Sequence, residues 1–475
     1  MELQYNPGDR DSVLSYAKRL KKRTLRSMCN AEILEHAYQG KGNFGQVLER
    51  YYFGYVPNSL AEPDFPKIGL ELKSSPLKQL KNGEYRSKER LVLNIINYFN
   101  VVEQEFENSD FLKKNAKILL IFYLYLAGID ILDLPIKIVD EWDFSLTDLE
   151  VIKNDWLTIK RKVADGKAHE LSEGDTFYLG ACTKGANSSS LRKQPFSDTL
   201  AKQRAFSFKQ GYVNHIIASL SGQQDEKFGK LIPSLMDAKN KTIEEIVIEK
   251  FSPFYGKDIE ELVDIFHLQA INNKSKQYFS SVSTAILNKI LDVPLEKNAS
   301  KYLEEFNKAE IKIKTVRLKG NNLPSEDISF PTFKYCEVID ESWEDSVIKD
   351  ALEHKFLFVF FQYCGERLVL RKVAFWNMPY SDMLEVEKVW RKTSDIVLNG
   401  NIVREVKIND KGEERNLTNF PDKKFNHVSH VRPHARTKND TYPLPTRDKV
   451  TGLNEYTKHC FWLNNSYVRD EIFLK

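Results

Sequence analysis

The feature that most constrains the fold of this 475-residue chain is an internal repeat of aromatic and aliphatic segments. The segment KILLIFY, which begins at Lys117, has a counterpart in KFLFVFF, which begins at Lys355, 238 positions later. Downstream, Trp142 is matched by Trp376, 234 positions later. Self-similarity at a nearly constant offset indicates a duplicated structural unit. The sequence therefore predicts a tandem duplication of one fold.

A third pair of segments shows how the two copies differ in length. RAFSFKQGYV from Arg204 parallels HCFWLNNSYV from His459, now 255 positions apart, so the second copy carries an insertion of about twenty residues, which suits a surface loop. The polar segment SGQQDEKFGK begins at Ser221 and is the best linker candidate. We expect a first domain at 1–220, a linker at 221–241 and a second domain at 242–475.

The spacing of apolar residues predicts mixed α/β domains. A period near 3.6 predicts helices over residues 12–28, 44–53, about 87–99 and 147–163, and again within 242–268. The short aromatic run over 118–125 predicts a buried strand.

Composition narrows the class of protein further. The hydrophobic content of 41% supports sizeable cores. The five cysteines are odd in number and scattered, without a CxxC pair, so neither a disulfide framework nor a zinc site is indicated. No apolar run reaches the roughly 18 residues of a membrane span. We expect a cytoplasmic protein with no membrane association.

The segment AEPDFPKIGLELKSSPLK, which begins at Ala61, carries the strongest chemical signal. Asp64 precedes Glu71 by seven residues, and Lys73 follows Glu71 by two, so Glu71 and Lys73 share one face of a strand. Hydrolysis of a phosphodiester requires a divalent ion, an activated water and positive charge near the transition state. Carboxylate oxygens are the ligands that Mg²⁺ prefers. The spacing predicts a metal-dependent phosphodiesterase, with Lys73 orienting or deprotonating the water.

The same Glu-x-Lys triplet occurs twice more in the chain. Glu310 to Lys312 and Glu405 to Lys407 lie on equally strand-like runs, where a solvated strand face is the simpler interpretation. The first copy differs because Asp64 lies upstream, a helix bearing a glutamate precedes it and a basic loop follows it. The triplet alone is weak evidence for a nuclease.

The stretch GKGNFGQVLERYYFGYVPNSLAEPDFPKIGLELKSSPLK resembles the catalytic segment of the MutH mismatch-repair nickase and of the GATC-cutting, Sau3A-type type II restriction endonucleases. These nucleases form the MutH-like branch of the PD-(D/E)xK superfamily, and the resemblance extends over nearly the whole chain. It implies Mg²⁺-dependent cleavage of double-stranded DNA, with Asp64, Glu71 and Lys73 as the catalytic set. It also implies that each copy has a central mixed sheet flanked by helices.

Two further site residues are implied by the same resemblance. Glu49, in GQVLE, falls on the helix glutamate that supports metal binding. Lys114, in FLKKNAKILL, falls near a further catalytic lysine, and Lys113 is a rival for that position.

The second copy is expected to lack the catalytic acids. Asp64-Phe65-Pro66 has an apparent partner in Ser329-Phe330-Pro331, 265 positions later, and the same offset places Cys336 opposite Glu71. Neither serine nor cysteine replaces a carboxylate as a Mg²⁺ ligand. Glu337 stands next to Cys336 but has no aspartate partner. The second half is therefore predicted to bind DNA without cutting it.

Both halves also contain a segment that resembles the DNA-reading motif of the family. HVRPHARTKND places Arg432 and His434 on an RPKA-like motif, and LGACTKGANSSSL places Lys184 on its lysine and Cys182 on its arginine. Arginine or lysine paired with guanine is the commonest specific base contact, so Lys184, Arg432 and His434 are candidates for DNA contact. A surface salt bridge is the alternative role of Arg432.

Basic residues elsewhere predict contacts to the phosphate backbone. Lys78 belongs to a cationic segment between Lys73 and Arg90 that surrounds an Asn-Gly turn. Such groups make DNA affinity dependent on salt, although most charged loops are simply solvated. Lys209, directly after the FSF strand, is a further predicted DNA contact.

Together these features predict a type II restriction endonuclease that cuts at GATC, with a second DNA copy bound by the rear half as an effector. A cognate DNA methyltransferase is the expected functional partner. Single chains and dimers on DNA both stay open. A MutH-type nickase and a non-cleaving, sequence-specific DNA-binding protein are the alternatives.

Overall fold

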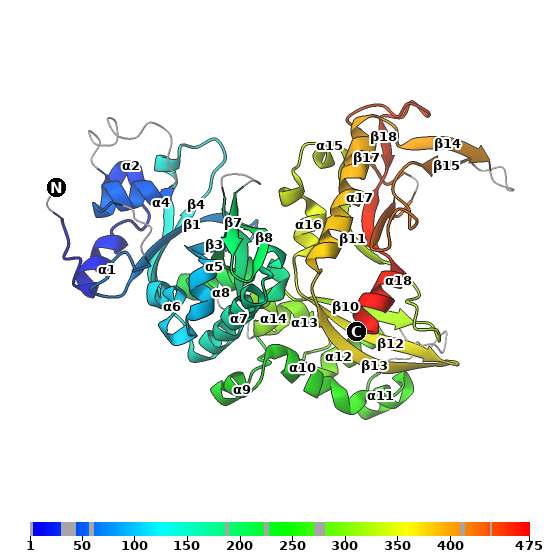
Figure 1. Ribbon diagram of the computed structural model, residues 1–475, viewed down its shortest axis with the longest axis horizontal. Helices are drawn as coiled ribbons and strands as arrows, with labels where there is room; N and C mark the ends of the chain where they lie inside the picture. Colours follow the sequence, from blue (N-terminus) through cyan, green and yellow to red (C-terminus); the bar gives the residue numbers. More distant parts are fainter. Residues whose placement is uncertain are drawn as a thin grey trace. The chain divides into compact units, whose positions relative to one another are not determined.

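The computed structural model describes residues 3–29, 44–56, 61–185, 190–222, 228–269, 281–408, 414–437 and 439–475. The chain forms two compact units, one of residues 1–246 and 299–310 and one of residues 247–298 and 311–475 (Figure 1). This division differs from the expected linker at 221–241. The described part of that segment belongs to the first unit, and residues 223–227 lie outside the described residues. The boundary falls within α10, Ile243–Phe251.

The main sheet of the first unit is mixed, which confirms the expected α/β class. Its strand order is β2-β1-β4-β5, with β1 and β4 parallel and the outer pairs antiparallel. The bounds are Glu71–Gln79 for β1, Tyr85–Ser87 for β2, Lys117–Leu124 for β4 and Ile136–Asp143 for β5. The predicted strand at 118–125 is β4, and its residues from Ile118 to Phe122 are almost completely buried, as a strand with neighbours on both sides requires.

A second, antiparallel sheet of the first unit has the order β3-β9-β6. Its strands are β3, Leu91–Ile95; β6, Leu179–Thr183; and β9, Arg204–Phe208. The hairpin of β7, Leu191–Gln194, and β8, Ser197–Lys202, connects β6 to β9. The predicted helix at about 87–99 is wrong over 91–95, because this segment pairs with β9.

The longest helix of the first unit is α7, Leu146–Ala164, where the sequence predicts a helix over 147–163. Ser145 caps it by accepting a hydrogen bond from the Asp148 N–H, and the indole of Trp156 is fully buried on its inner face. The other helices are α1, Arg10–Lys18; α2, Leu25–Met28; α4, Phe44–Val47; the π-helix η1, Leu48–Phe53; α5, Tyr98–Glu103; η2, Phe106–Asn108; α6, Asp110–Asn115; η3, Ile131–Asp133; η4, Ala168–Glu170; η5, Glu173–Asp175; α8, Gln210–Ser221; α9, Leu235–Asn240; α13, Ala299–Tyr302; and α14, Glu304–Ala309.

The second unit repeats this plan. One sheet has the order β10-β12-β13, with β10 and β12 parallel, and another has the antiparallel order β11-β19-β16. The strands are β10, Lys312–Leu318; β11, Ile328–Phe333; β12, Phe356–Cys364; β13, Arg367–Trp376; β14, Val403–Ile408; β15, Glu414–Thr418; β16, Ser429–Pro433; β17, Thr441–Pro443; β18, Glu455–Thr457; and β19, His459–Leu463.

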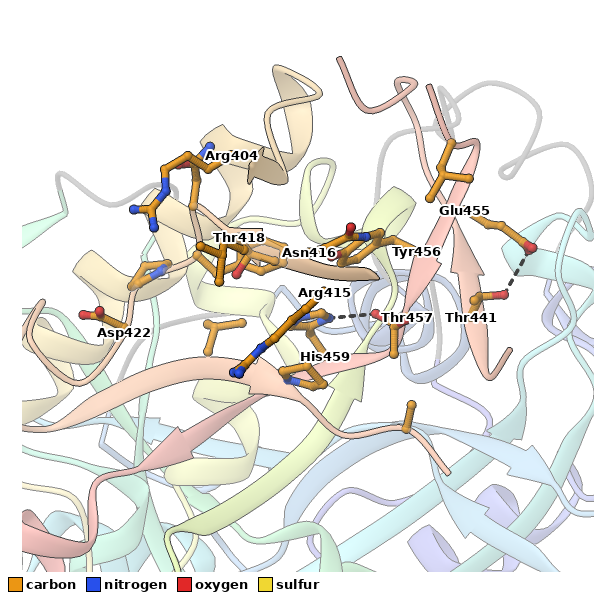
Figure 2. A pocket seen from close by; sticks show the side chains of 18 of the residues that line it. Arg404, Arg415, Asn416, Thr418, Asp422, Thr441, Glu455, Tyr456, Thr457 and His459 are labelled. Carbon is orange, nitrogen blue, oxygen red and sulfur yellow. Dashed lines mark hydrogen bonds between the residues drawn. The ribbon is translucent and has the colours of Figure 1, made fainter. Parts of the chain in front are cut away.

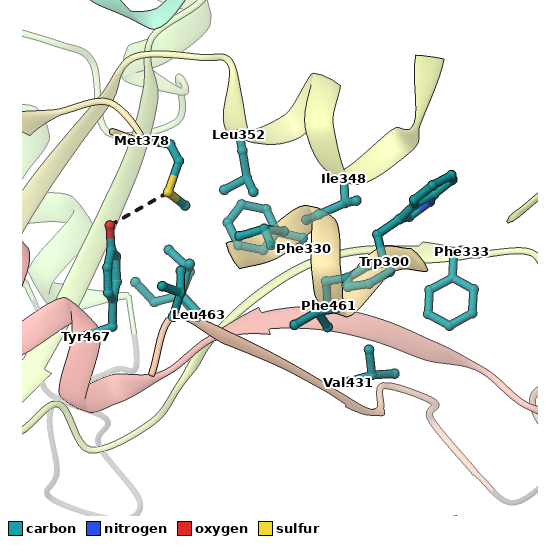
Figure 3. Packing of buried hydrophobic residues seen from close by; sticks show 14 of the residues in the cluster. Phe330, Phe333, Ile348, Leu352, Met378, Trp390, Val431, Phe461, Leu463 and Tyr467 are labelled. Atoms are coloured by element: carbon teal, nitrogen blue, oxygen red, sulfur yellow. Dashed lines mark hydrogen bonds between the residues drawn. The ribbon is translucent and has the colours of Figure 1, made fainter. Parts of the chain in front are cut away.

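The helices of the second unit include α17, Tyr380–Leu398, the counterpart of α7 at the offset of 234. In the hydrophobic core of the second unit, Trp390 of α17, Phe330 of β11 and Phe461 of β19 pack with aliphatic side chains (Figure 3). The remaining helices are η6, Ser252–Phe254; α11, Ile259–Ile265; α12, Val282–Ile290; α15, Tyr335–Val338; η7, Trp343–Asp345; α16, Val347–Leu352; α18, Asn465–Tyr467; and the π-helix η8, Val468–Phe473.

The strand registers identify which residues of the two copies correspond. Glu71 of β1 pairs with Ile118 of β4, and Lys312 of β10 pairs with Phe356 of β12. Because Ile118 and Phe356 are matched by the repeat at 238 positions, Lys312 occupies the position of Glu71.

The predicted matches of Asp64 with Ser329 and of Glu71 with Cys336 are therefore wrong. Ser329 lies on β11, which pairs with β19 as β3 pairs with β9, and Cys336 lies on the short helix α15. The shared Phe-Pro dipeptide misled the alignment. The loss of the carboxylate at the position of Glu71 is nevertheless real, since a lysine stands there.

The expected insertion is mainly the β14–β15 hairpin. Leu179 of β6 and Ser429 of β16 occupy equivalent register positions 250 apart, whereas the preceding helices are 234 apart. The sixteen added residues correspond to the hairpin, whose described strands pair antiparallel.

Candidate active site

A tight turn brings Asp64 to the beginning of strand β1. The turn from Phe65 to Leu70 is closed by backbone hydrogen bonds between these two residues in both directions. The Asp64 N–H donates to Oε2 of Glu71 at 3.0 Å, and the Leu72 N–H donates to Oδ2 of Asp64 at 3.0 Å. The seven-residue spacing thus places both carboxylates at one end of the strand.

Two ammonium groups converge on the Glu71 carboxylate. Lys73 donates a hydrogen bond to Oε1 of Glu71, and Nζ of Lys114 lies 3.8 Å from the same oxygen. Glu71 is only 1% exposed, and the side chains of Lys73 and Lys114 are 18% and 10% exposed. Of the two rival lysines on α6, Lys114 therefore lies at the site, while Lys113 is exposed.

Burial changes the acidity of the carboxyl groups at this site. The pKa of Glu71 is raised from 4.5 to about 7, mainly by burial, while Lys73 lowers it and Asp64 raises it. Glu49, carried by the π-helix η1, likewise has its pKa raised to about 7 by burial and then by the charge of Asp64. Asp64, Glu71 and Lys73 act on Glu49 electrostatically, so the structure brings all predicted catalytic residues together.

Tyr55 is a residue of this site that the sequence analysis missed. Its hydroxyl is buried and has no hydrogen-bond partner among the described residues. Burial raises the pKa of Tyr55, and the charges of Asp64, Glu49 and Glu71 raise it further. Its ring contacts Phe65 edge-on, with centroids 5.8 Å apart. No spacing signal marked it, because it follows an aromatic run that reads as core.

The donor set fits a hard divalent cation such as Mg²⁺. Asp64, Glu71 and Glu49 offer carboxylate oxygens, and the unpartnered Tyr55 hydroxyl adds a polar atom beside them. The described residues hold no preassembled group of three ligands. Mg²⁺ is usually bound by one or two carboxylates together with water and substrate phosphates, and the adjoining carboxylates of Asp64 and Glu71 meet that requirement.

The predicted DNA-contact residues of the first unit lie in different environments. Lys78, near the end of β1, and Lys184, directly after β6, are exposed. The Lys184 N–H donates to the Gln203 carbonyl at 2.8 Å, which fixes the end of the predicted reading strand. Residues 186–189 of that reading segment lie outside the described residues.

Lys209 does not have the position expected of a DNA contact. It is 5% exposed, and its ammonium donates a hydrogen bond to the Thr176 carbonyl. Burial raises the pKa of nearby Asp155 to about 6, and this rise is partly offset by the N–H groups of residues 177–179, which its carboxylate accepts, and by the charge of Lys209. Lys209 therefore stabilises the start of β6.

In the second unit, Arg432 and His434 lie at the end of β16 beside the same indole. The Arg432 guanidinium lies 3.8 Å from the Trp462 ring centroid and donates a hydrogen bond to Asp327 at 2.9 Å. The exposed His434 contacts Trp462 edge-on, with centroids 5.1 Å apart. In the strand registers of the two copies, Arg432 occupies the position of Cys182, and His434 occupies the position of Lys184. The motif alignment predicted both matches.

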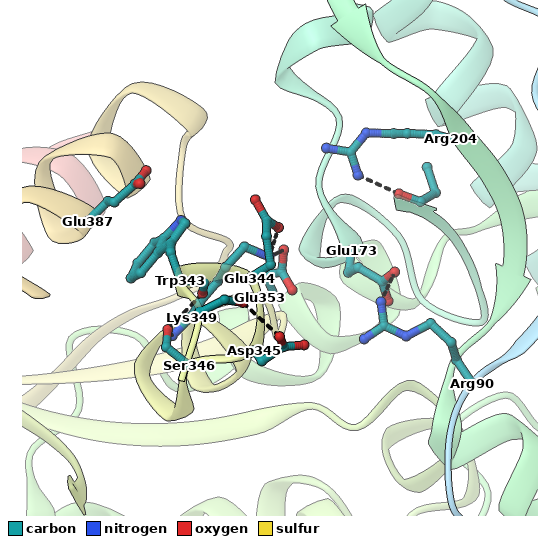
Figure 4. A network of polar contacts seen from close by, with 12 residues as sticks. Arg90, Glu173, Arg204, Trp343, Glu344, Asp345, Ser346, Lys349, Glu353 and Glu387 are labelled. Carbon is teal, nitrogen blue, oxygen red and sulfur yellow. Dashed lines mark hydrogen bonds and ion pairs between the residues drawn. The ribbon is translucent and has the colours of Figure 1, made fainter. Parts of the chain in front are cut away.

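One ion pair has reversed charges in the two copies. In the first unit, Arg90 precedes β3 and pairs with Glu173 at 2.5 Å (Figure 4). In the second unit, Asp327 precedes β11 and pairs with Lys423 at 2.6 Å. Glu173 and Lys423 each lie six residues before the strand that bears the reading segment. Each pair anchors the loop that leads into that strand.

The second unit also contains a pocket of about 1230 Å³ (Figure 2). Arg404 and Arg415 of the β14–β15 hairpin line it, and Pro433 and Ala435 of the predicted reading segment border it. The rim is ordered by hydrogen bonds such as that from Thr441 to Glu455 at 3.0 Å. The inserted hairpin therefore adds cationic groups next to the reading segment.

The helices formed by the described residues include none that is both long and apolar enough for a transmembrane span.

Comparison with known proteins gives consistent matches. The family described as "DNA mismatch repair enzyme MutH" matches residues 53–155. The type II restriction enzyme Sau3AI of Staphylococcus aureus is 37% identical over 467 residues, which cover 92% of this chain and 94% of that enzyme. The DNA mismatch repair protein MutH of Buchnera aphidicola subsp. Baizongia pistaciae (strain Bp) is 28% identical over 32% of this chain and 67% of its own length, and MutH of Shewanella woodyi (strain ATCC 51908 / MS32) is 25% identical over 47% of this chain and 96% of its own length.

Proposed function

The chain belongs to the family of the type II restriction enzyme Sau3AI and is a site-specific deoxyribonuclease, and from this premise we propose that it cuts both strands of DNA at GATC in the presence of Mg²⁺. The convergence of Lys73 and Lys114 on the buried Glu71, beside Asp64, is the observation that carries this proposal.

Each residue of the site has a distinct role in this proposal. Asp64 and Glu71, supported by Glu49, hold the cation, which supplies Lewis-acid stabilisation of the scissile phosphate when bound. Lys73 orients the attacking water and neutralises charge that develops on the phosphate. Burial raises the pKa of Glu71, and Lys114, by its positive charge, partly offsets this rise and so favours the ionised carboxylate.

DNA is held by residues around this site. Lys78 contacts the phosphate backbone and Lys184 contacts a base, consistent with their exposed positions near the end of β1 and directly after β6. Backbone contacts fix the position of the protein on the duplex, and base contacts give specificity.

The second unit is proposed to bind another DNA copy and to stimulate cleavage by the first. Lys312 in place of Glu71 removes a metal ligand, while Arg432 and His434 preserve the reading segment. The coupling between the sites is a free energy that must be measured. A plasmid with two GATC sites should be cut faster than one with a single site, and equal rates without stimulation by an added GATC duplex would contradict the effector role.

Digestion of phage DNA by the purified full chain tests the main proposal. Linear fragments with ends mapped to GATC, formed with Mg²⁺ and absent with EDTA, are the expected result. Accumulation of nicked circles from a plasmid would instead indicate a MutH-type nickase, and binding without cleavage would indicate a DNA-binding protein. A cognate methyltransferase is the proposed functional partner, and assembly of two chains on DNA is tested by sedimentation with and without the duplex.

A further inference from the structure

A second cationic site lies in the second unit, at the position that corresponds to the active site of the first. The register that matches Glu71 with Lys312 also matches Lys73, which pairs with Leu120, with Lys314, which pairs with Phe358. The second copy has therefore lost an acid and kept the catalytic-type lysine. The strand that holds a Glu–Lys pair in one unit holds two lysines in the other.

Lys314 is partly buried and makes no ion pair with an acid among the described residues. No ion pair joins Lys312 or Lys314 to an acid in the part of the chain that the structure describes, and the Lys314 ammonium lies 5.8 Å from the Phe330 ring centroid. Burial and then the charge of Lys312 lower the pKa of Lys314. Two neighbouring ammonium groups on one strand face repel each other and are stabilised by an anion between them.

Lys314 lines a pocket of about 470 Å³ that is rich in hydroxyl groups. Ser283, Thr284, Thr315, Ser325 and Ser329 contribute to its wall. Ser283 is 3% exposed, and its hydroxyl has no hydrogen-bond partner among the described residues. A buried hydroxyl without a partner costs free energy that a bound ligand recovers.

The pocket also contains the first turn of α12. This nine-residue helix begins at Val282, and its N-cap residue Ser281 makes no side-chain capping hydrogen bond. The positive end of a helix favours a phosphate oxygen. The first turn of α12, the Ser283 hydroxyl and the Lys314 side chain thus border the same pocket.

Two acidic residues at the rim limit the choice of ligand. Asp327 lines the pocket, but its carboxylate is paired with Arg432 and Lys423. Glu326 is exposed and can turn toward solvent. The basic residues of the pocket wall are Lys314 and Arg317, and Lys312 adds its charge next to Lys314.

We propose that this pocket binds a phosphate group without a metal ion, with Lys312 and Lys314 supplying the positive charge that a divalent ion supplies at the first site. The inference rests on the proposed DNA binding by the second unit and specifies its chemistry: a backbone phosphate of the effector duplex. Binding of effector DNA is then independent of Mg²⁺, whereas productive binding at the first site requires it.

Binding of a 20-base-pair GATC duplex to the full chain in EDTA tests this proposal. The wild-type chain should bind about one equivalent, and the double variant Lys312→Gln/Lys314→Gln should bind at least tenfold more weakly. Each lost phosphate contact should also reduce the magnitude of the negative slope of log affinity against log salt by about 0.9. Lys388→Gln, on the exposed face of α17, is the matched control and should behave as wild type.

Two smaller changes separate a binding role from a folding role. Lys314→Arg keeps the charge and should retain most of the affinity, and Ser283→Ala should weaken binding severalfold with unchanged thermal unfolding. Equal affinities and equal salt slopes for wild type and the folded double variant in EDTA would overturn the proposal. If wild type still cuts at GATC with Mg²⁺, that result leaves the proposed function intact.

Inorganic phosphate distinguishes the two sources of the ligand. At constant ionic strength, phosphate in place of chloride should raise the melting temperature of wild type and leave that of the double variant unchanged. If inorganic phosphate also weakens binding of the duplex to wild type, the two compete for the same pocket, and the ligand is a phosphate of the DNA backbone. Stabilisation by phosphate without any effect of the lysines on duplex binding would overturn the assignment to DNA.

Discussion

The ammonium of Lys73 donates a hydrogen bond to Oε1 of Glu71, two residues earlier on the same strand. The period of two along β1 places both side chains on one face, at the end where Asp64 closes its turn. The strand thus presents one cation and one anion side by side, a pair of charges suited to a substrate phosphate and its counter-ion. This pair links the strand geometry to the proposed chemistry.

Replacement of Lys73 by methionine should lower the rate of cleavage by about 10²- to 10³-fold, the size of effect seen when one preorganised electrostatic group is removed. Single-turnover cleavage of a one-site duplex measures it. Lys407→Met is the matched control, because Lys407 follows Glu405 in the same triplet 3.7 Å away on an exposed hairpin. An equal loss in both variants would show that the triplet, and not its site, determines activity.

Mg²⁺ affinity should rise with pH between 6 and 8. The pKa values of Glu49 and Glu71 are about 7, so each carboxyl must lose a proton before it binds the ion. The apparent affinity is expected to increase by up to about tenfold per pH unit for each proton displaced, and to level off above pH 8. Calorimetric titration in buffers of different ionisation enthalpy counts these protons. Mg²⁺ binding to the Glu49→Gln variant should displace fewer protons than binding to wild type. An Mg²⁺ affinity that does not change with pH would contradict the predicted protonation of Glu49 and Glu71.

The metal-free chain should lose stability as pH rises through the same range. Because the pKa of Glu71 is raised from 4.5 to about 7, the folded state holds more protons than the unfolded state within that window. The free energy of unfolding of the first unit therefore falls from pH 4.5 to 7 through this group. Urea unfolding at pH 5 and pH 8 should show a smaller difference in Glu71→Gln than in wild type; an unchanged difference would argue against the raised pKa.

Gly166→Ala should destabilise the first unit more than Gly83→Ala. Both glycines have positive φ, 71° and 88°, which costs an alanine about 1–2 kcal/mol. A Cβ on Gly166 would lie 2.6 Å from the Phe196 carbonyl oxygen, whereas a Cβ on Gly83 meets nothing within 4 Å. The difference in unfolding free energy between the two variants isolates the steric contribution, and equal values would exclude it.

Substitutions at Lys209 and Lys78 should have different effects, because Lys209 has a structural role and Lys78 binds DNA. Lys209→Met leaves the Thr176 carbonyl without its buried donor and should lower the unfolding free energy by about 1–3 kcal/mol. Lys78→Met should leave stability unchanged and reduce the salt slope of DNA binding by about 0.9. Chemical denaturation and fluorescence anisotropy provide the two measurements; the opposite assignment of effects would restore Lys209 as a DNA contact.

The sequence predicted those features that depend on local pattern. The strand of Glu71 and Lys73, the buried strand β4 and the long helix α7 follow from periodicity within one segment. The segment 91–95 was predicted as helix because its apolar spacing suits either structure, and only its pairing with β9, more than a hundred residues away, makes it a strand.

Properties that depend on three-dimensional packing could not be predicted. The burial of Lys209 follows from the Thr176 carbonyl and from Asp155, which the sequence does not place beside it. The replacement of Glu71 by Lys312 in the second copy is visible only through the register of β10 with β12. Tyr55 likewise joins the site only when folding buries it near the carboxylates of Asp64, Glu49 and Glu71.

The single-turnover rate of duplex cleavage by Asp64→Ala in saturating Mg²⁺ tests the central claim most directly. With the carboxylate of Asp64 absent from the end of β1, cleavage at GATC should fall at least about a thousandfold, while the folded variant still binds the duplex in EDTA through its second unit. Cleavage by Asp64→Ala at the wild-type rate would show that DNA is cut elsewhere in the molecule.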